Sequence, residues 1–352
     1  MFRSVNNLKQ LRRCFSTKSA PILEALHEKS LLRISGDEVN DYLQGLITND
    51  MNHLMNHGTC MYAMFLNTKG RVLYDTIIYK TIKDNTYLIE CDTKTVDSLR
   101  KHLKIYKLRR KIDIVNMTDE LAVHALFNLD HLNVTEELDL FNKNIDNVSN
   151  NLNKELIKEN KSIKMFNDLS IYQDPRMSLL GSRIITPKNI SVKDEITKLT
   201  EVQTQIDSRT YKWFRYNLGV GEGVNDLPTE HCFPLEANCD YLHGVSFHKG
   251  CYIGQELTAR TYHTGVVRKR LMPLIFSKVP TKPACDSNII SDNVNLGKLR
   301  GIEGNAGLAL LRIAKSIDLK EIKISDGIAT TRKPIWWPIE APKEKVAAQK
   351  NE

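Results

Sequence analysis

The sequence has no hydrophobic run that approaches the roughly 20 residues needed for a membrane-spanning helix. It has no C-x-x-C pair among its seven cysteines, whose odd number and scattered spacing argue against a disulfide framework and a self-contained zinc site. The G-x-S-x-G, H-E-x-x-H, P-loop and Rossmann motifs are also missing. These absences indicate a protein of a reducing compartment, without a membrane segment and without a common catalytic template.

The first 20 residues contain no acidic side chain, and the first acid of the chain is Glu24. Hydrophobic residues recur there at steps of three or four among five basic ones, at Phe2, Val5, Leu8, Leu11 and Phe15. Such an acid-free, arginine-bearing, amphipathic start is typical of a mitochondrial transit peptide. We therefore expect residues 1–15 to be a transit peptide, with the mature chain beginning at Ser16. A basic tail without a targeting role is the alternative.

The positive charge of the chain is concentrated in this leader. Of the formal net charge of +8, residues 1–20 carry +5, which leaves +3 for the rest of a 352-residue chain. A net charge of +3 does not indicate a binding surface for DNA or RNA. We therefore expect no nucleic-acid partner, and a role in RNA modification is the weakest hypothesis. The length predicts two or three domains of ordinary globular composition.

The first third of the mature chain mixes strands with helices. Runs of β-formers predict strands at residues 31–35, 59–66, 71–79 and 86–90. Apolar spacing predicts helices at 37–45, capped by Asp37, and at 94–104. Residues 67–70 predict a hairpin turn with Gly70 at a positive φ. Hairpins in place of strict strand–helix alternation favour an α+β domain over a doubly wound sheet.

The rest of the chain gives weaker signals. Strands are predicted at 112–115, 121–127, 170–172 and 179–185, a helical stretch at 192–218, and a small β domain from Val266 to Trp337. Between them, an Asn-rich, low-complexity segment at 142–164 indicates an exposed insertion.

The run from His248 to Glu256, His-Lys-Gly-Cys-Tyr-Ile-Gly-Gln-Glu, is the most informative segment of the chain. A strand is predicted before it at 242–247, and a helix within and after it at 255–260. Cys251 is therefore expected on a strand-to-helix turn, beside Lys249 and near the positive end of a helix dipole. Both effects favour a thiolate and lower a cysteine pKa to about 3.5–7.5. A small buried side chain on a tight turn is the alternative.

Four other groups are candidates. Asp75, between bulky apolar residues, is either a contact for a cationic or N–H-bearing ligand or an edge carboxylate. Asp174 and Arg176, joined by a proline, predict a structural ion pair. The glycines of 219–223 follow a predicted helix and indicate a helix cap and turn, because a phosphate cradle needs glycines before the helix. Glu236, shortly before the cysteine segment, is either a ligand contact or a solvated acid.

The segment Gly244–Arg260 resembles the signature of the YgfZ/GcvT-like folate-binding family. Further matches follow in order along the chain, at residues 33–37, 42–50, 66–71, 174–176 and 219–223. With the leader, the chain is most similar to the mitochondrial branch of this family, whose members assemble iron–sulfur clusters.

The resemblance implies an α+β fold, the three-domain ring of the glycine-cleavage aminomethyltransferase. This ring has two α+β domains and a C-terminal β-barrel around a central cavity. On this basis we predict a discontinuous first domain at 20–116 plus 200–262, a second domain at 117–199 containing the insertion 142–164, a β-barrel at 263–340 and a disordered tail at 341–352.

The resemblance also implies a late role in the mitochondrial matrix, where [2Fe–2S] clusters are converted to [4Fe–4S] clusters with an A-type scaffold protein, for targets such as aconitase and lipoate synthase. A cluster needs about four thiolate-type ligands, and Cys251 has no cysteine nearer in sequence than Cys239. We therefore hypothesise that Cys251 is one ligand of a [2Fe–2S] cluster shared with the scaffold, and that the chain alone is a monomer. The supporting motif residues are Lys249, Gly250, Tyr252, Gly254, Gln255, Glu256 and Arg260.

The alternative is a tetrahydrofolate-dependent aminomethyl transferase. The enzymes that the chain resembles bind tetrahydrofolate and use an acid at the position matching Asp75. The equivalent pocket would contain Asp75, Arg215, Asn217, Glu236 and Asn238. Where those enzymes tend to have Arg-x-Glu-Ala-Gly, this chain has Arg-Tyr-Asn-Leu-Gly, so Asn217 lacks the charge that would hold the pterin ring. We therefore expect an assembly factor rather than an enzyme.

Overall fold

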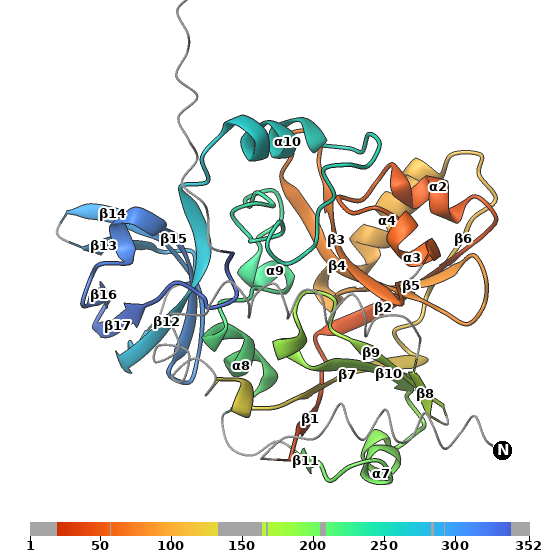
Figure 1. Ribbon diagram of the computed structural model, residues 1–352, viewed down its shortest axis with the longest axis horizontal. Coiled ribbons are helices and arrows are strands. Elements are labelled where there is room, and N and C mark those ends of the chain that lie inside the picture. The colour runs from red at the N-terminus through yellow and green to blue at the C-terminus, as the bar shows by residue number, and fades with distance from the viewer. Residues whose placement is uncertain are drawn as a thin grey trace, which may run out of the picture.

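The computed structural model describes residues 20–56, 58–132, 164–166, 168–204, 209–282, 285–291 and 293–338. Three β-sheets with helices packed around them make up the described chain (Figure 1). The predicted transit peptide, the Asn-rich insertion apart from Lys164, and the predicted tail lie outside the described residues. None of the described helices is long and apolar enough to span a bilayer.

The first sheet is antiparallel and has five strands in the order β3-β4-β5-β2-β6. Its strands are β2 (Lys29–Ser35), β3 (Cys60–Leu66), β4 (Val72–Lys80), β5 (Thr86–Asp92) and β6 (Asp113–Asn116). The helices α2 (Val39–Gln44), α3 (Asn52–Asn56) and α4 (Val96–Lys107) cover one face. These elements confirm the strands and helices predicted for this region. The cap predicted at Asp37 is wrong, because the residue before α2 is Glu38, which makes no side-chain cap.

Strand β3 is buried along its whole length because both faces of the first sheet are covered. Met61, Ala63 and Phe65 belong to the core under the helices. Tyr62 and Met64, which point to the opposite face, belong to a core shared with the rest of the molecule. A strand buried on both faces has no polar alternation, as the run Cys-Met-Tyr-Ala-Met-Phe-Leu shows.

The second sheet has six strands in the order β11-β1-β7-β10-β9-β8. Its strands are β1 (Ile22–Ala25), β7 (Leu121–Phe127), β8 (Lys164–Phe166), β9 (Leu169–Gln173), β10 (Ser182–Pro187) and β11 (Gln203–Thr204). Strand β1 precedes the first sheet in sequence but pairs with β7 and β11 in the second. The domain bounds drawn from the sequence stay predictions, and the sheets show that the chain enters the second sheet before it builds the first.

The continuous helical stretch predicted at 192–218 is wrong. It contains two separate helices, α7 (Val192–Thr197) and α8 (Tyr211–Asn217). Between them, β11 pairs in parallel with β1, Ile22 opposite Gln203. This non-local pairing overrides the helical periodicity of the sequence.

The third sheet has six strands in the order β13-β14-β15-β12-β17-β16. Its strands are β12 (Lys269–Lys278), β13 (Asn288–Ser291), β14 (Val294–Glu303), β15 (Ala306–Arg312), β16 (Ile322–Ile324) and β17 (Gly327–Thr331), with α11 (Ile313–Ser316) after β15. The edge strands β13 and β16 approach each other, and irregular register in β12 and β14 bends the sheet. The sheet is therefore a nearly closed β-barrel, as the resemblance implied.

The three sheets share one hydrophobic core. It contains Tyr62 from the first sheet, Phe127 from the second, and Leu308 from the barrel. Helix α8, the short helix α9 (Gly223–Asp226) and the helix α10 (Gln255–Thr264) lie between the sheets or bridge them (Figure 1). The expected arrangement of two α+β parts and a C-terminal barrel is confirmed.

Candidate functional site

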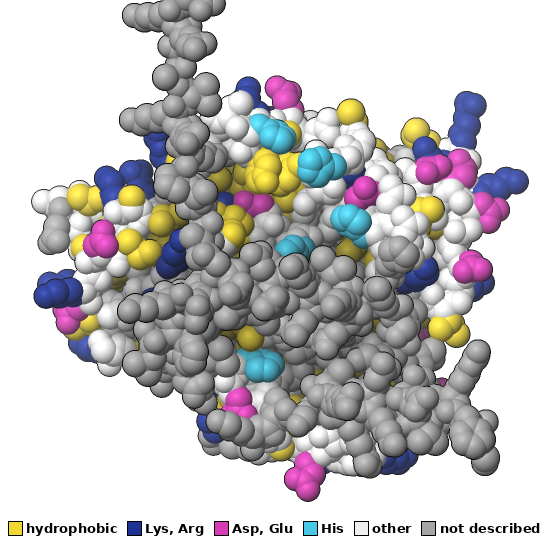
Figure 2. Space-filling model, in the orientation of Figure 1, with side chains coloured by type: hydrophobic (Ala, Val, Ile, Leu, Met, Phe, Trp, Pro, Cys, Tyr) yellow, Lys and Arg dark blue, Asp and Glu magenta, His cyan; other side chains and the backbone are white. Residues whose placement is uncertain are grey.

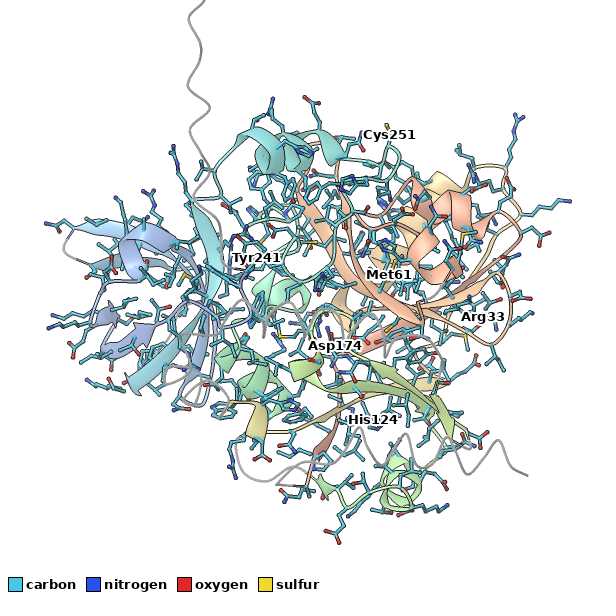
Figure 3. The ribbon with its side chains drawn as sticks, viewed as in Figure 1. Arg33, Met61, His124, Asp174, Tyr241 and Cys251 are labelled. Carbon is cyan, nitrogen blue, oxygen red and sulfur yellow. The ribbon has the colours of Figure 1, made fainter. Side chains whose placement is uncertain are left out.

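Cys251 lies on the surface, in an irregular loop that precedes α10. Its thiol is exposed, and the side chain projects from the outer edge of the molecule near the start of that helix (Figure 3). The alternative of a small buried side chain is therefore wrong. The hypothesis of a reachable sulfur, on which a shared cluster depends, is consistent with this placement.

Lys249 anchors this loop to the first sheet's helices. Its Nζ donates hydrogen bonds to three main-chain carbonyl oxygens, of Gln44 at 2.7 Å, Ile47 at 2.7 Å and Asn49 at 2.6 Å. An ammonium group has three donors, and all three are used here. Burial lowers the pKa of Lys249 to about 8, so the group is protonated and forms these bonds at neutral pH.

The strand predicted before Cys251 is wrong, because residues 242–247 form a turn, irregular backbone and a bend. The helix predicted at 255–260 is confirmed, since α10 begins at Gln255 with Gly254 as its N-cap. The Lys249 ammonium donates to carbonyl oxygens. The observation that suits Cys251 to be a ligand is its exposure.

The segment after α2 also binds the cysteine loop through further hydrogen bonds to its main chain. Ser246 N donates to Thr48 O at 3.0 Å, and Ile253 N donates to Gly45 O at 3.1 Å. The Thr48 hydroxyl donates to Gly244 O at 2.6 Å. The loop is thus fixed at both ends and in the middle. Two sequence segments that both match the family signature, 42–50 and 244–260, meet in space.

A second contact joins the β3–β4 hairpin to the start of α10. Gly70 has φ +73°, which confirms the predicted turn, and Gly254 has φ +80°. A methyl group on Gly254 would lie 2.3 Å from Asn67 O, which explains why a glycine is required there. Gln255 closes the loop, because its Oε1 accepts from Tyr252 N at 3.1 Å.

The remaining motif residues are open to solvent. Gly250, Glu256 and Arg260 are exposed, and a methyl group on Gly250 would meet nothing within 4 Å. Among the described residues, these three therefore leave one side of the loop open beside the Cys251 thiol.

Most other thiols of the described chain are out of reach. Cys60, Cys91, Cys232 and Cys239 are buried. Burial raises the pKa of Cys232 to about 11 and raises that of Cys91 and Cys239 further. Within the described ranges, no group of three or more His, Cys, Asp or Glu residues could hold a metal ion. A cluster bound at Cys251 therefore needs ligands from outside this part of the chain.

Aromatic side chains flank the loop on its α10 side. The rings of Phe247 and Tyr262 stack with centroids 3.6 Å apart, and His263 lies edge-on to both. Figure 2 shows hydrophobic and histidine side chains gathered at the surface around this helix. Sequence reasoning missed this aromatic patch, because Phe247 was assigned to a strand and Tyr262 lay beyond the motif.

The centre of the molecule holds a buried cluster of charges. The ion pair predicted between Asp174 and Arg176 is confirmed, with Arg176 Nε and an Nη donating to separate carboxylate oxygens at 2.9 and 2.6 Å. Asp174 lies between the sheets (Figure 3). Glu222 pairs with Arg176 at 2.6 Å, Arg183 at 2.8 Å and Lys29 at 2.9 Å.

Electrostatics in this central cluster keep Glu222 ionised. Burial acts to raise the pKa of Glu222, but the cations of Arg176, Lys29, Arg183 and Arg215 hold it well below its usual range. Elements from the first sheet, the second sheet and the α8–α9 segment all contribute charges, so the cluster ties these parts together.

Four of the five residues expected in a folate-like pocket make contacts within the molecule. Asp75 is 8% exposed, and its two carboxylate oxygens accept from Gly223 N at 3.1 and 3.2 Å. The other contacts are Arg215 to Asp226 at 2.5 Å, Asn217 Nδ2 to Trp213 O at 2.9 Å, and Asn238 Nδ2 to Leu271 O at 2.9 Å. Burial raises the pKa of Asp75, against the effect of Lys29.

Glu236 is the fifth of these residues. It lines a pocket of about 400 Å³ between the 233–236 loop, α10 and residues 266–269. Neither Asp75, Arg215, Asn217 nor Asn238 is among the residues that line it. Of the five expected residues, Glu236 alone is among those that line this pocket.

Comparisons with known proteins agree with this architecture. Residues 17–127 match the family model of the GCVT N-terminal domain, and residues 268–339 match that of the CAF17 C-terminal beta-barrel domain. Among solved structures, the glycine cleavage system aminomethyltransferase T from Bartonella henselae superposes with a TM-score of 0.64 at 12% identity, over 94% of this chain and 89% of that one. At this identity the likeness shows the fold alone.

Curated relatives are similar over nearly the whole chain. The mouse protein named "Iron-sulfur cluster assembly factor IBA57, mitochondrial" is 34% identical over 334 residues, which cover 90% of this chain and 85% of the relative. The human protein of the same name is 34% identical over 329 residues, covering 89% and 84%. Because these relatives are 34% identical and the matches cover about nine tenths of this chain, the chain belongs to the IBA57 family of iron–sulfur cluster assembly factors.

Proposed function

We propose that this chain is a mitochondrial matrix factor that acts late in iron–sulfur cluster assembly, in the maturation of [4Fe–4S] proteins of the aconitase and lipoate synthase type. In this proposal Cys251 supplies one ligand to a [2Fe–2S] cluster, and an A-type scaffold protein supplies the others. The names of the mouse and human relatives support the general role and the compartment.

The single observation that carries the proposal is the exposure of the Cys251 thiol on an anchored loop, in contrast to the four buried thiols. Cys251 is exposed on an anchored loop, whereas four cysteines are buried. A cluster takes about four ligands, and the described residues contain no group of three or more His, Cys, Asp or Glu residues that could hold a metal ion. One reachable sulfur on a fixed loop suits a cluster that is completed by a second protein.

The surroundings of the loop suit such a partner. The stacked rings of Phe247 and Tyr262, with His263 beside them, form an aromatic patch next to the cysteine loop. Aromatic side chains are enriched where proteins contact one another. The three carbonyl bonds of Lys249 hold the loop in place before the partner arrives, which reduces the entropy lost on binding. Alone, the chain is expected to be a monomer.

Anaerobic reconstitution with an A-type scaffold tests the proposal. The wild-type chain mixed with scaffold, iron and sulfide is expected to give a coloured heterodimer with visible absorption, whereas the chain alone stays colourless. Cys251→Ser is expected to abolish the coloured heterodimer. Cys285→Ser, which removes the other exposed thiol of the described chain, is the matched control and is expected to behave as wild type. A coloured heterodimer formed by Cys251→Ser would disprove the shared ligand.

The contacts of Asp75 favour this function over tetrahydrofolate-dependent transfer. A carboxylate that binds substrate must be reachable, but Asp75 is buried and accepts from Gly223 N. Calorimetric titration with tetrahydrofolate is expected to show no binding. Measurable binding that Asp75→Asn abolishes would restore the transferase hypothesis.

A further inference from the structure

Residues 98–112, here called the basic segment, concentrate positive charge on the part of the molecule built around the first sheet. The segment contains seven lysines and arginines and no aspartate or glutamate. The chain beyond residue 20 carries a net charge of only +3, so its remaining residues are together net negative. The segment forms most of α4 and the connection to β6, on the side of the molecule away from the barrel (Figure 1). Its charge favours an anionic partner.

The outward face of α4 mixes cations with apolar side chains. The helix packs Val96, Leu99 and Leu103 into the core of the first sheet. Four exposed residues follow the helical spacing of the opposite face, at Lys101, Lys104, Ile105 and Leu108. Ile105 is 60% exposed and Leu108 is 84% exposed. Large apolar side chains are therefore presented to solvent among cations.

Leu108 also has an unfavourable backbone conformation. It follows α4 with φ +53° and ψ −119°, a conformation that favours glycine. Because the side chain is exposed, packing within the described chain does not offset this strain. Strained residues are concentrated at functional and binding sites. A leucine at this position therefore indicates a contact outside the molecule.

One part of the basic segment is balanced by acids and another part is not. Lys107 and Lys111 line a surface hollow together with three acids, Asp37, Asp84 and Asp113. Lys104 and Arg109 are exposed, do not line this hollow and form no ion pair within the described part of the chain. A lysine near the end of a helix complements the helix dipole, but this explains neither Arg109 nor the exposed apolar side chains.

These features fit an anionic bilayer surface better than a nucleic acid or an acidic protein. At a bilayer, apolar side chains enter the headgroup region while neighbouring cations meet lipid phosphates. Single-stranded nucleic acids stack on open aromatic rings, but the ring of Tyr106 packs against His102 with centroids 4.8 Å apart. A protein partner is held mainly by side chains that fill apolar pockets, and the hollow beside the segment is lined mainly by polar residues.

We propose that the basic segment docks this chain on the surface of an anionic phospholipid bilayer. Leu108 and Ile105 enter the headgroup region, and Lys104 and Arg109 contact lipid phosphates. The contact is peripheral, so it needs no membrane-spanning helix. The inference goes beyond cluster assembly, because the basic segment contains no residue of the cysteine loop.

Co-sedimentation with vesicles tests the docking. The expected mature chain from Ser16 onward is used, because the basic leader is itself attracted to anionic lipid and its removal leaves every described residue in place. Vesicles of equal parts phosphatidylcholine and phosphatidylglycerol are expected to sediment the chain at low salt, and added salt to release it. Vesicles of phosphatidylcholine alone should leave it in solution. Absence of binding to the mixed vesicles, or equal binding to both kinds, would overturn the proposal.

Paired charge variants locate the contact. Each cation near an anionic surface contributes a factor of about five in affinity. Lys104→Gln combined with Arg109→Gln is therefore expected to weaken binding to the mixed vesicles roughly 25-fold. Lys315→Gln combined with Lys320→Gln removes the same charge from exposed positions after β15 and is the matched control, expected to weaken binding less than about threefold. Equal weakening in both double variants would mean that only net charge matters, and the proposal would fall.

Leu108→Gly separates docking from folding. Glycine accepts this backbone without strain, so the Tm of the isolated chain is expected to rise, whereas vesicle binding is expected to weaken at least about fivefold. Ile290→Thr, which removes an exposed apolar side chain from β13, is the control and should bind as wild type. Wild-type binding by Leu108→Gly would contradict insertion of the leucine. Weaker binding together with a lowered Tm would assign Leu108 to the fold and also contradict the proposal.

The other occupants are tested with the same chain. A single-stranded RNA or a polyglutamate peptide that binds the basic segment, while the mixed vesicles do not, would replace the bilayer as its partner and overturn the proposal. Formation of the coloured heterodimer is expected to be the same in Leu108→Gly as in wild type, so failure of the docking is distinguishable from failure of the shared cluster.

Discussion

The cysteine loop and the central charge cluster use similar residues in opposite ways. In the centre, Arg176, Arg183 and Lys29 pair with Glu222, and the side chains are almost completely buried. In the loop, the Lys249 cation pairs with main-chain carbonyl oxygens, and the thiol two residues later is left exposed. In the central cluster, charged side chains form ion pairs with one another. In the cysteine loop, the Lys249 side chain binds the main chain instead, and the Cys251 thiol stays exposed.

This difference places an exposed thiol at the rim of the fold and paired charges at its centre. The centre, where the related fold was expected to offer a ligand cavity, is occupied around Asp75 and Glu222 by paired charges and a main-chain donor. Such a cluster fixes the relative positions of the sheets. The thiol of Cys251, in contrast, lies at the surface.

Removal of the central anion should have the largest effect on stability. Glu222→Gln leaves the cations of Arg176, Arg183 and Lys29 with one anion fewer in a buried site. We expect a loss of about 3–5 kcal/mol in the free energy of unfolding, measured by chemical denaturation. Glu195→Gln, which breaks the exposed pair with Lys198, is the control and should cost less than about 1 kcal/mol. Equal losses of unfolding free energy in the two variants would show that the central ion pairs stabilise the fold no more than an exposed pair does.

The contribution of Glu222 to stability should also depend on pH. The pKa of folded Glu222 lies well below the usual 4.5, so its ionised form stabilises the fold fully above that value. As the pH falls below about 4.5 towards the folded pKa, this stabilisation is lost. The difference in unfolding free energy between wild type and Glu222→Gln should therefore be constant near neutral pH and shrink in acid. A difference that grows in acid would contradict the assignment of Glu222 as the ionised partner.

Gly254→Ala should have the next largest effect on stability, because Gly254 lies in close contact with the β3–β4 hairpin at the start of α10. The left-handed backbone costs a non-glycine residue about 1–2 kcal/mol, and the added methyl group would clash with Asn67 O at 2.3 Å. We expect a loss of more than about 2 kcal/mol together with weaker scaffold binding. Gly250→Ala meets no neighbour and should change stability by less than about 0.5 kcal/mol. Similar losses in both variants would mean that the loop is not anchored through Gly254.

Lys249→Met should loosen the loop with a smaller loss of stability. It leaves the three carbonyl oxygens without their ammonium donor, at an expected cost of about 1–3 kcal/mol. Hydrogen exchange is expected to speed up at the amides of Ser246 and Ile253, which bond to the same segment. Unchanged exchange at these amides would show that Lys249 does not position the loop.

Local features of the molecule were predictable from the sequence. The turn at Gly70, the pair formed by Asp174 and Arg176, and helix α10 each depend on residues that are close in sequence. Spacing and residue type therefore suffice to predict them.

Features that depend on distant partners were not predictable. The alternating run at 242–247 has the pattern of a strand, but its backbone bonds to Thr48 and the neighbouring residues, which lie almost 200 positions away. The same holds for the carbonyl partners of Lys249 and for β11, whose pairing with β1 interrupts the predicted helix.

The central claim is tested most directly by native mass spectrometry of the anaerobically reconstituted heterodimer. The account predicts one chain of each protein plus the mass of a single [2Fe–2S] cluster for wild type. For Cys251→Ser it predicts loss of both the cluster mass and the heterodimer, while the Tm of the isolated chain is unchanged. A heterodimer of Cys251→Ser that retains the cluster mass would contradict the account.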